Sequence, residues 1–113
     1  MIKIYHNSRC SKSRCGLQIL EDSGTDFEIV KYLEDTPSVE ELTKLIEILG
    51  ISALQLVRKG EAIWKENFKS KSLTDIELIE AMVKHPKLIE RPIVLNGNKA
   101  VIGRPPELIL DII

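Results

Sequence analysis

The sequence predicts an α/β fold with a mixed four-stranded sheet and a block of helices inserted between the second and third strands. A strand, helix and strand pattern occupies residues 2–32, helical patterns run over about residues 36–86, and a hairpin pattern with a last helix ends the chain. At 113 residues the chain is long enough for one core and too short for two. We therefore expect a single domain over residues 1–113.

The first part of the chain predicts two parallel strands joined by a helix. The short apolar run at residues 2–5 is typical of a central strand. Helical spacing follows over residues 11–23, with Gly24 as the expected stop. Residues 27–32 alternate apolar and polar side chains, as a strand does. So short a strand, helix and strand unit favours a right-handed crossover.

The middle of the chain contains two helix-start signals. Ser38 with Glu41, and Thr74 with Glu77, have the spacing of a capping box, in which a side chain and a backbone N–H at each end of the box satisfy each other. Apolar residues recur at helical spacing after each box. We therefore predict two amphipathic helices within residues 36–86.

Weaker helical patterns lie between these two helices, around residues 53–57 and around Trp64. We expect Trp64 to pack inside the inserted block, residues 69–71 to be solvated surface, and His85 to cap the end of the second helix. No linker, repeat or low-complexity segment separates this block from the rest.

The last part of the chain predicts a hairpin and a helix. Asn96-Gly97 stands between the apolar runs 91–95 and 99–102, and this dipeptide is the strongest short hairpin signal in a sequence. The pattern over residues 103–112 is helical, with prolines tolerated in the first turn.

The composition excludes several classes of function. The net charge is −1, with 43% hydrophobic and 29% charged residues, so we expect no general binding to nucleic acid or to a membrane surface. No apolar run approaches the roughly 18 residues of a membrane span, and the start lacks a signal-peptide pattern, so we expect a cytoplasmic protein. We also expect the chain to be a monomer. No cysteine and histidine cluster has metal-ligand spacing.

Cys10 is the candidate nucleophile. It lies where the loop after the first strand enters the first helix, and a helix start offers unpaired N–H groups and the positive end of the helix dipole to an anion such as a thiolate. Residues 1–16 also contain lysine and arginine but no aspartate or glutamate. The alternative is that Cys10 is a small buried hydrophobic residue, as free cysteines often are.

The second cysteine is expected to have a packing role. On one regular helix Cys10 and Cys15 would be rotated by about 140° and separated by about 7.5 Å along the axis. A disulfide needs Cα atoms within about 7 Å and converging Cβ vectors. Cys15 is therefore expected to pack and not to act as a resolving thiol.

Five motifs are spread over the whole chain, namely HNSRCSKSR at residues 6–14, LVRK at 56–59, HP at 85–86, ERPIV at 90–94 and GRPPE at 103–107. Together they resemble the ArsC family of glutaredoxin-linked arsenate reductases, within the thioredoxin superfamily. The resemblance implies a thioredoxin-like fold. The same family includes the Spx transcription regulators, which bind RNA polymerase.

The resemblance also implies roles for individual residues. Cys10 corresponds to the family's nucleophile, and His6 to a histidine that helps to keep the thiol ionised. The other implied residues are three arginines that bind the oxyanion, two residues beside the anion and the cis-proline of thioredoxin folds, namely Arg58, Arg91, Arg104, Ser13, Arg14 and Pro92. Arginine suits a tetrahedral oxyanion because its planar fork donates two parallel hydrogen bonds, although each arginine alone is more often a surface cation.

The function implied by the resemblance is reduction of arsenate to arsenite through a cysteinyl-arsenate intermediate on Cys10. Glutathione and glutaredoxin would be external reductants, with no bound cofactor or metal. Two positions depart from the family pattern: Ser8 stands where many members have proline, and Ser13 stands where many Spx proteins complete a Cys-x-x-Cys switch. The alternative of an Spx-like regulator that binds RNA polymerase with little catalysis is weakened by that missing switch.

Overall fold

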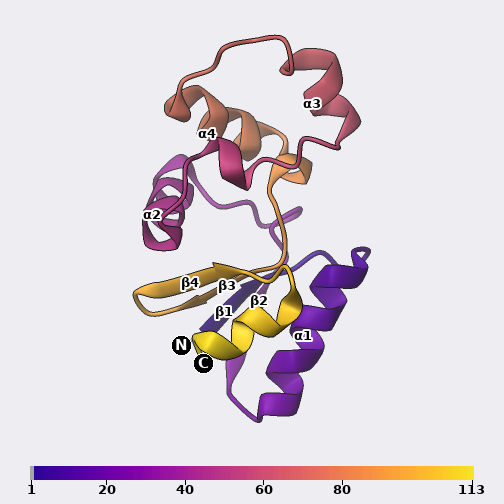
Figure 1. Cartoon of the computed structure of the whole chain (residues 1–113), viewed down its shortest axis with the longest axis vertical. Coiled ribbons are helices and arrows are strands. Elements are labelled where there is room, and N and C mark those ends of the chain that lie inside the picture. The colour runs from indigo at the N-terminus through magenta and orange to yellow at the C-terminus, as the bar shows by residue number, and fades with distance from the viewer. Residues whose placement is uncertain (1) are drawn as a thin grey trace. The chain divides into compact units, whose positions relative to one another are not determined.

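The computed structural model describes residues 2–113, which form two compact units (Figure 1). One unit contains the chain up to Asp35 together with Arg91–Ile113, and the other is Thr36–Glu90, the region where the sequence predicts inserted helices. The single domain stays a prediction. The elements are β1 (Ile2–Tyr5), α1 (Ser11–Ser23), β2 (Phe27–Val30), α2 (Val39–Leu49), η1 (Leu54–Leu56), α3 (Ala62–Asn67), α4 (Asp75–Lys84), η2 (Pro86–Leu88), β3 (Ile93–Asn96), β4 (Lys99–Ile102) and η3 (Pro106–Asp111), where η is a 3₁₀ helix.

The first unit contains a mixed four-stranded sheet with the strand order β2-β1-β3-β4. Strand β1 pairs in parallel with β2 and antiparallel with β3, and β3 pairs antiparallel with β4. Both the mixed sheet and the central position of β1 confirm the prediction. Because β1 is hydrogen-bonded on both sides, the loop that leaves its carboxyl end starts from a rigid support.

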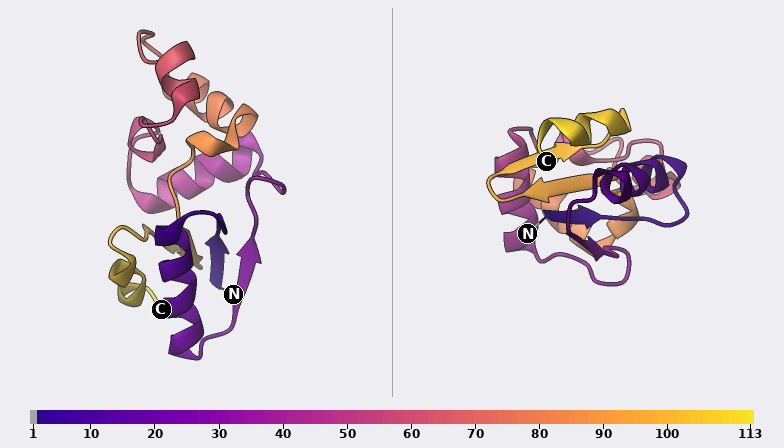
Figure 2. Two further views of the ribbon diagram at one scale, coloured as in Figure 1. Left: turned by 90° about the vertical axis from the view of Figure 1, so that its right-hand side faces the viewer. Right: turned by 90° about the horizontal axis from the view of Figure 1, so that it is seen from below.

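The core of the first unit lies between this sheet and two helices. Contacts join α1 to η3, and both lie on the same face of the sheet (Figure 2). Burial of apolar side chains in this layer supplies the main stabilising contribution. The buried core residues are Ile2, Ile4, Leu20, Val94 and Ile109.

Pro92 is closely packed between two backbone segments of the first unit. The peptide bond between Arg91 and Pro92 is cis, as the resemblance implies. A Cβ atom added to Gly16 would lie 2.9 Å from Pro92 Cγ, and one added to Gly103 would lie 3.0 Å from the same atom. Ile109 Cδ1 would be 3.0 Å and 3.1 Å from these two positions. Glycine at both sites therefore allows the backbone to approach the proline ring.

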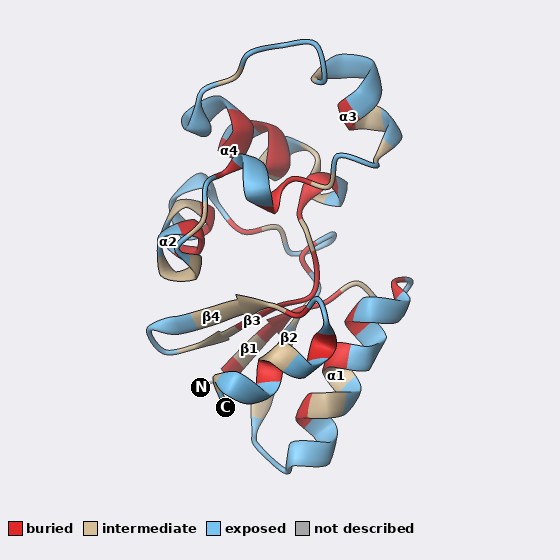
Figure 3. Ribbon diagram, viewed as in Figure 1, coloured by how far each residue is buried: buried red, intermediate tan, exposed pale blue. Residues whose placement is uncertain are grey.

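The second unit is helical, and its apolar interior lies where α2 contacts α4 (Figure 3). Both predicted capping boxes are confirmed. Ser38 Oγ accepts a hydrogen bond from the Glu41 N–H at 3.1 Å, and Thr74 Oγ1 accepts one from the Glu77 N–H at 3.2 Å. The helices bury Leu42, Leu45 and Ile46 from α2, with Leu78, Ile79, Ala81 and Met82 from α4.

The last part of the chain differs from the prediction in its details. Strand β3 begins at Ile93 and not at residue 91, because proline has no N–H to donate to a neighbouring strand. Asn96 pairs with Lys99, so the turn residues are Gly97 and Asn98. Gly97 has a φ of 62°, as the first central residue of a type II′ turn requires. The final helix is a 3₁₀ helix.

None of the helices among residues 2–113 combines the length and apolar character of a membrane span. The same residues contain no group of three histidine, cysteine, aspartate or glutamate side chains that could hold a metal ion.

Candidate functional site

Cys10 occupies the N-cap position of α1, as predicted. Its φ and ψ of −98° and 123° are extended, and its carbonyl accepts the Arg14 N–H at 3.0 Å to begin the helix. The Cys10 side chain makes no capping hydrogen bond. The sulfur is therefore at the positive end of the helix dipole, beside N–H groups that have no partner within the helix.

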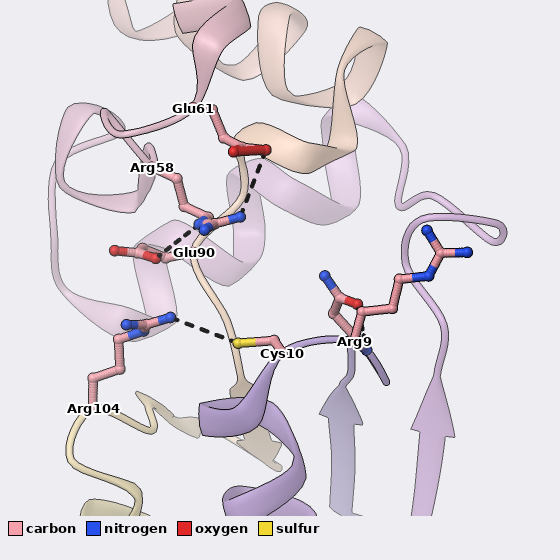
Figure 4. A network of polar contacts seen from close by, with 7 residues as sticks. Arg9, Cys10, Arg58, Glu61, Glu90 and Arg104 are labelled. Carbon is pink, nitrogen blue, oxygen red and sulfur yellow. Dashed lines mark hydrogen bonds and ion pairs between the residues drawn. The ribbon is translucent and has the colours of Figure 1, made fainter.

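Arg104 brings a cation to this sulfur. Its Nη2 lies 3.9 Å from Cys10 Sγ, although the two residues are 94 positions apart (Figure 4). The Arg104 Nε donates to the Arg91 carbonyl at 2.9 Å, which fixes the direction of the guanidinium plane. The Arg91 side chain is itself buried. The structure thus joins Cys10 to Arg104, and Arg104 to the backbone of Arg91, within the first unit, while contact of the Arg91 side chain with an anion stays a prediction.

His6 and Ser13 form a buried hydrogen-bonded pair behind the loop. Ser13 Oγ lies 2.7 Å from His6 Nδ1 and accepts the Asn7 N–H at 2.9 Å. We assign the hydroxyl hydrogen to His6 Nδ1, which leaves the ring proton of a neutral imidazole on Nε2. Burial lowers the pKa of His6, hydrogen bonding to the Ser13 backbone raises it, and the positive charges of Arg14 and Lys31 lower it again. His6 is therefore a neutral hydrogen-bonding residue at neutral pH.

Asn7 organises the loop, although no role was predicted for it from the sequence. Its Oδ1 accepts the Arg9 N–H at 3.0 Å, and its carbonyl accepts the Cys10 N–H at 3.0 Å. An asparagine two residues before the N–H that it binds is the signature of an Asx turn. That spacing before a predicted helix could have identified Asn7 from the sequence.

Arg9 and Arg14 are the other arginines near Cys10 in the sequence. Arg14 Nη1 donates to the Ser8 carbonyl at 2.9 Å, so this side chain is bound to the loop backbone. Figure 4 shows the Arg9 side chain directed away from Cys10 Sγ. Of the loop's cationic side chains, Arg14 therefore supports the loop that carries the sulfur, and its contact with an anion stays a prediction.

Arg58 belongs to the second unit, so its convergence with Cys10 also stays a prediction. Its backbone N–H donates to the Leu88 carbonyl at 2.7 Å. Its guanidinium lies 3.7 Å from a Glu61 carboxylate oxygen and 3.8 Å from one of Glu90 (Figure 4). These side chains are 26% to 27% exposed, and ion pairs of this kind contribute little stability.

Cys15 does not pack, so the packing role predicted for it is wrong, while its having no role as a resolving thiol stays a prediction. Both cysteines are free, and Cys15 is exposed. The buried positions of α1 are Ser13, Gly16 and Leu20, which recur at helical spacing. Cys15 lies outside this stripe because the contact with Pro92 turns Gly16 toward the interior.

Several known proteins are similar to this chain over nearly its whole length. A protein of Escherichia coli (strain K12) named Uncharacterized protein YfgD is 50% identical and covers 99% of this chain and 96% of its own length. An arsenate reductase of Haemophilus influenzae is 46% identical, with 97% of each chain covered. The solved arsenate reductase from Vibrio cholerae has a TM-score of 0.94 at 47% identity and covers 99% of this chain and 97% of its own.

These relatives span nearly the whole chain, which includes the helix-start cysteine, the cis-proline and the arginine after β4. The structural match confirms the predicted thioredoxin-like fold, with its four-stranded mixed sheet. The sequence model of the ArsC family matches residues 5–112, and the chain belongs to this family.

Proposed function

We propose that this protein is an arsenate reductase that uses glutathione and glutaredoxin as its external reductants. The observation that carries the proposal is the Arg104 guanidinium 3.9 Å from Cys10 Sγ at the start of α1. Relatives at 46% and 47% identity are named arsenate reductases. We also propose that it acts in the cytoplasm, where glutathione is available, and that it acts as a monomer.

The cluster has the charge that a thiolate and an oxyanion both need. The helix dipole and the Arg104 guanidinium favour a negative sulfur and a negative ligand beside it. Arg104 is directed by its bond to the Arg91 carbonyl, so it does not have to reorganise when charge develops. We assign oxyanion binding to Arg58, Arg91 and Arg104, with Ser13 and Arg14 keeping the loop in place.

In the first step, the Cys10 thiolate attacks arsenic. An S–As bond forms, an As–O bond breaks, and the oxygen leaves as water after taking up protons. The product is a cysteinyl-arsenate in which arsenic is still in the +5 state. His6 would hold Ser13, and through it the Asn7 backbone, so that the sulfur faces the anion.

In the second step, a glutathione thiolate attacks Cys10 Sγ. The S–As bond breaks and its electron pair stays on arsenic, which leaves as arsenite, while the two sulfurs form a mixed disulfide. A glutaredoxin thiolate then attacks the glutathione sulfur and restores Cys10 as a thiolate. No metal or bound organic cofactor takes part in these steps.

A coupled assay with arsenate, glutathione, glutaredoxin, glutathione reductase and NADPH tests the proposal. We expect turnover in the native protein and none in Cys10→Ser. Arg104→Ala should lower kcat/KM by about 10²- to 10³-fold, the usual effect of removing one donor to a developing anion. Circular dichroism should show that both variants stay folded.

Lys99→Ala is the matched control for Arg104→Ala, since Lys99 is an exposed cation of the same unit at the start of β4. Its kinetics should equal those of the native protein. Equal turnover in Arg104→Ala would remove this residue from the site. Absence of arsenate turnover in the native protein, together with capture of RNA polymerase, would support the regulator alternative.

A further inference from the structure

The second unit contains a cavity surrounded by lysines, which we call the lysine cavity. It has a volume of about 580 Å³, and the residues that define it here are Lys59, Lys65, Lys69, Lys71, Trp64 and Ser72. Three leucines complete its lining, and no aspartate or glutamate contributes to it. Its volume falls within the range of roughly 300–1,000 Å³ that small-molecule sites occupy.

The carboxylates around α3 line a different cavity from Lys65. Lys65 lines the lysine cavity, whereas Glu66, the next residue, lines a second cavity of about 650 Å³. Glu61, just before α3, also lines the second cavity, together with Lys84 and Lys87. The second cavity therefore has mixed charge, while the lysine cavity has charge of one sign.

The lysines of this cavity are exposed and lack carboxylate partners. Among residues 2–113, none of the four forms an ion pair, and only Lys71 has another charge contact, with its Nζ 5.9 Å from the centre of the Phe68 ring. The positive charges around the cavity repel one another. A multiply charged anion bound between them would be attracted to each lysine and would offset this repulsion.

An aromatic pair supports the cavity wall. The Trp64 and Phe68 rings are stacked with their centres 5.9 Å apart, and Trp64 is only 7% exposed. The lysines thus surround a fixed apolar wall, and Ser72 supplies a hydroxyl donor. Lysine binds phosphate as a flexible point charge, so this arrangement suits a ligand with several charged groups better than one planar carboxylate.

We propose that the lysine cavity binds a small polyanion that carries phosphate groups. The site is made only of residues of the second unit, so it does not depend on the proposed arsenate chemistry at Cys10. The lysines at residues 69 and 71, which the sequence predicts as ordinary solvated surface, would be ligand-binding residues.

The position of Trp64 provides a direct measurement, because it is the only tryptophan in the chain. Inorganic tripolyphosphate should change the Trp64 fluorescence in a saturable way at constant ionic strength, with sodium chloride as the blank. Isothermal titration calorimetry of the same mixture detects binding that leaves the fluorescence unchanged. Citrate, titrated in parallel, should bind more weakly if the site selects phosphate groups.

The double variant K65Q and K69Q should weaken tripolyphosphate binding by about tenfold or more, because two charge contacts are lost. The matched control is the double variant K84Q and K87Q, which removes the same charge from the second cavity of the same unit. This control should bind like the native protein.

Four results would overturn the proposal. One is the absence of binding by both methods, and another is equal weakening in the two double variants. The third is binding that Arg104→Ala abolishes while K65Q with K69Q leaves it intact, since that would place the polyanion beside Cys10. Tighter binding of citrate than of tripolyphosphate would reject the phosphate class.

Discussion

His6 lies buried behind the Cys10 loop, with its Nδ1 2.7 Å from Ser13 Oγ. The resemblance implies that this histidine helps to keep the thiol ionised. A neutral ring cannot do so by its own charge, and burial keeps the His6 ring neutral at neutral pH. Its contribution is therefore to hold Ser13, which in turn binds the Asn7 N–H.

Acidification should destabilise the protein through His6. The pKa of the folded-state ring lies below the usual value of 6.5, so the unfolded chain takes up the proton first as the pH falls. The free energy of unfolding therefore decreases from about pH 6.5 downward, until the pH passes below the folded-state pKa. His6→Asn keeps an acceptor for Ser13 and removes this dependence.

Urea denaturation of the native protein and of His6→Asn, between about pH 7.5 and pH 5, measures this effect. The native protein should lose stability relative to the variant as the pH falls. The same series on His85→Asn, which changes the other histidine, shows whether the effect belongs to His6. A difference between native protein and His6→Asn that stays constant with pH would contradict the assignment.

Single residues were predictable where a local pattern defines them. Cys10 could be placed at a helix start because strand and helix patterns flank it. The Asx turn of Asn7 has a local spacing that the sequence offers, and only its bond to Ser13 Oγ depends on the geometry of the loop. Cys15 was misplaced because helical spacing leaves the exact edge of the buried stripe open. The close approach of Gly16 to Pro92 fixes that edge, and it is a long-range contact.

At the scale of elements, α1 joins the candidate site to the core. Cys10 is the N-cap of this helix and Ser13 lies in its first turn. The next turn places Gly16 against the Pro92 ring and Ile109. Displacement of this turn would therefore move the helix start that holds the sulfur.

Gly16→Ala should destabilise the protein by up to about 2 kcal/mol. Alanine improves helix propensity by about 1 kcal/mol, whereas overpacking a core costs about 1–3 kcal/mol. The new Cβ would lie 2.9 Å from Pro92 Cγ, an atom of a rigid ring, so the overpacking cost should exceed the gain. Urea denaturation followed by circular dichroism measures the change.

Gly60→Ala is the control, since a Cβ there has no neighbour within 4 Å and the residue has no positive φ. Its stability should stay within about 0.5 kcal/mol of the native value. If Gly16→Ala is as stable as Gly60→Ala, the Pro92 contact has enough freedom to relax.

The helices that begin with a capping box were predicted best. The two capping boxes gave the starts of α2 and α4, because they are local pairs of side chain and backbone. The start of β3 and the hairpin turn depend on strand register. A shift of the register by one residue changes the place that Gly97 takes in the turn. The second cis bond, between Arg104 and Pro105, has no local signal that separates it from a trans bond.

For the whole molecule, the number of thiols limits the chemistry. The chain has two cysteines, and Cys15 is an exposed residue of α1 that forms no disulfide. Reduction of arsenate needs two electrons, which one thiol and an external thiol can supply together.

Cys15→Ser should therefore leave turnover in the coupled assay within about twofold of the native value, because no step of the proposed reaction uses this sulfur. Cys10→Ser serves as the inactive reference. A loss of activity comparable to that of Cys10→Ser, in a folded Cys15→Ser protein, would make Cys15 a resolving thiol and remove the need for glutathione as the attacking group.

The order of strands and helices followed from patterns within short stretches, so most of the fold was predictable. The approach of Arg104 to Cys10 joins residues 94 positions apart, and no local pattern encodes it. Only the resemblance to a family indicated it. Lys65 and Glu66 line different cavities because of the orientation of α3, which the short sequence of this helix does not determine.

The Pro92 ring has one more consequence. It touches the helix that carries the nucleophile on one side and the chain leading to Arg104 on the other. Because both segments pack on this one ring, we expect them to move together in thermal fluctuations. The distance between Cys10 Sγ and the Arg104 guanidinium should consequently vary less than the position of either group.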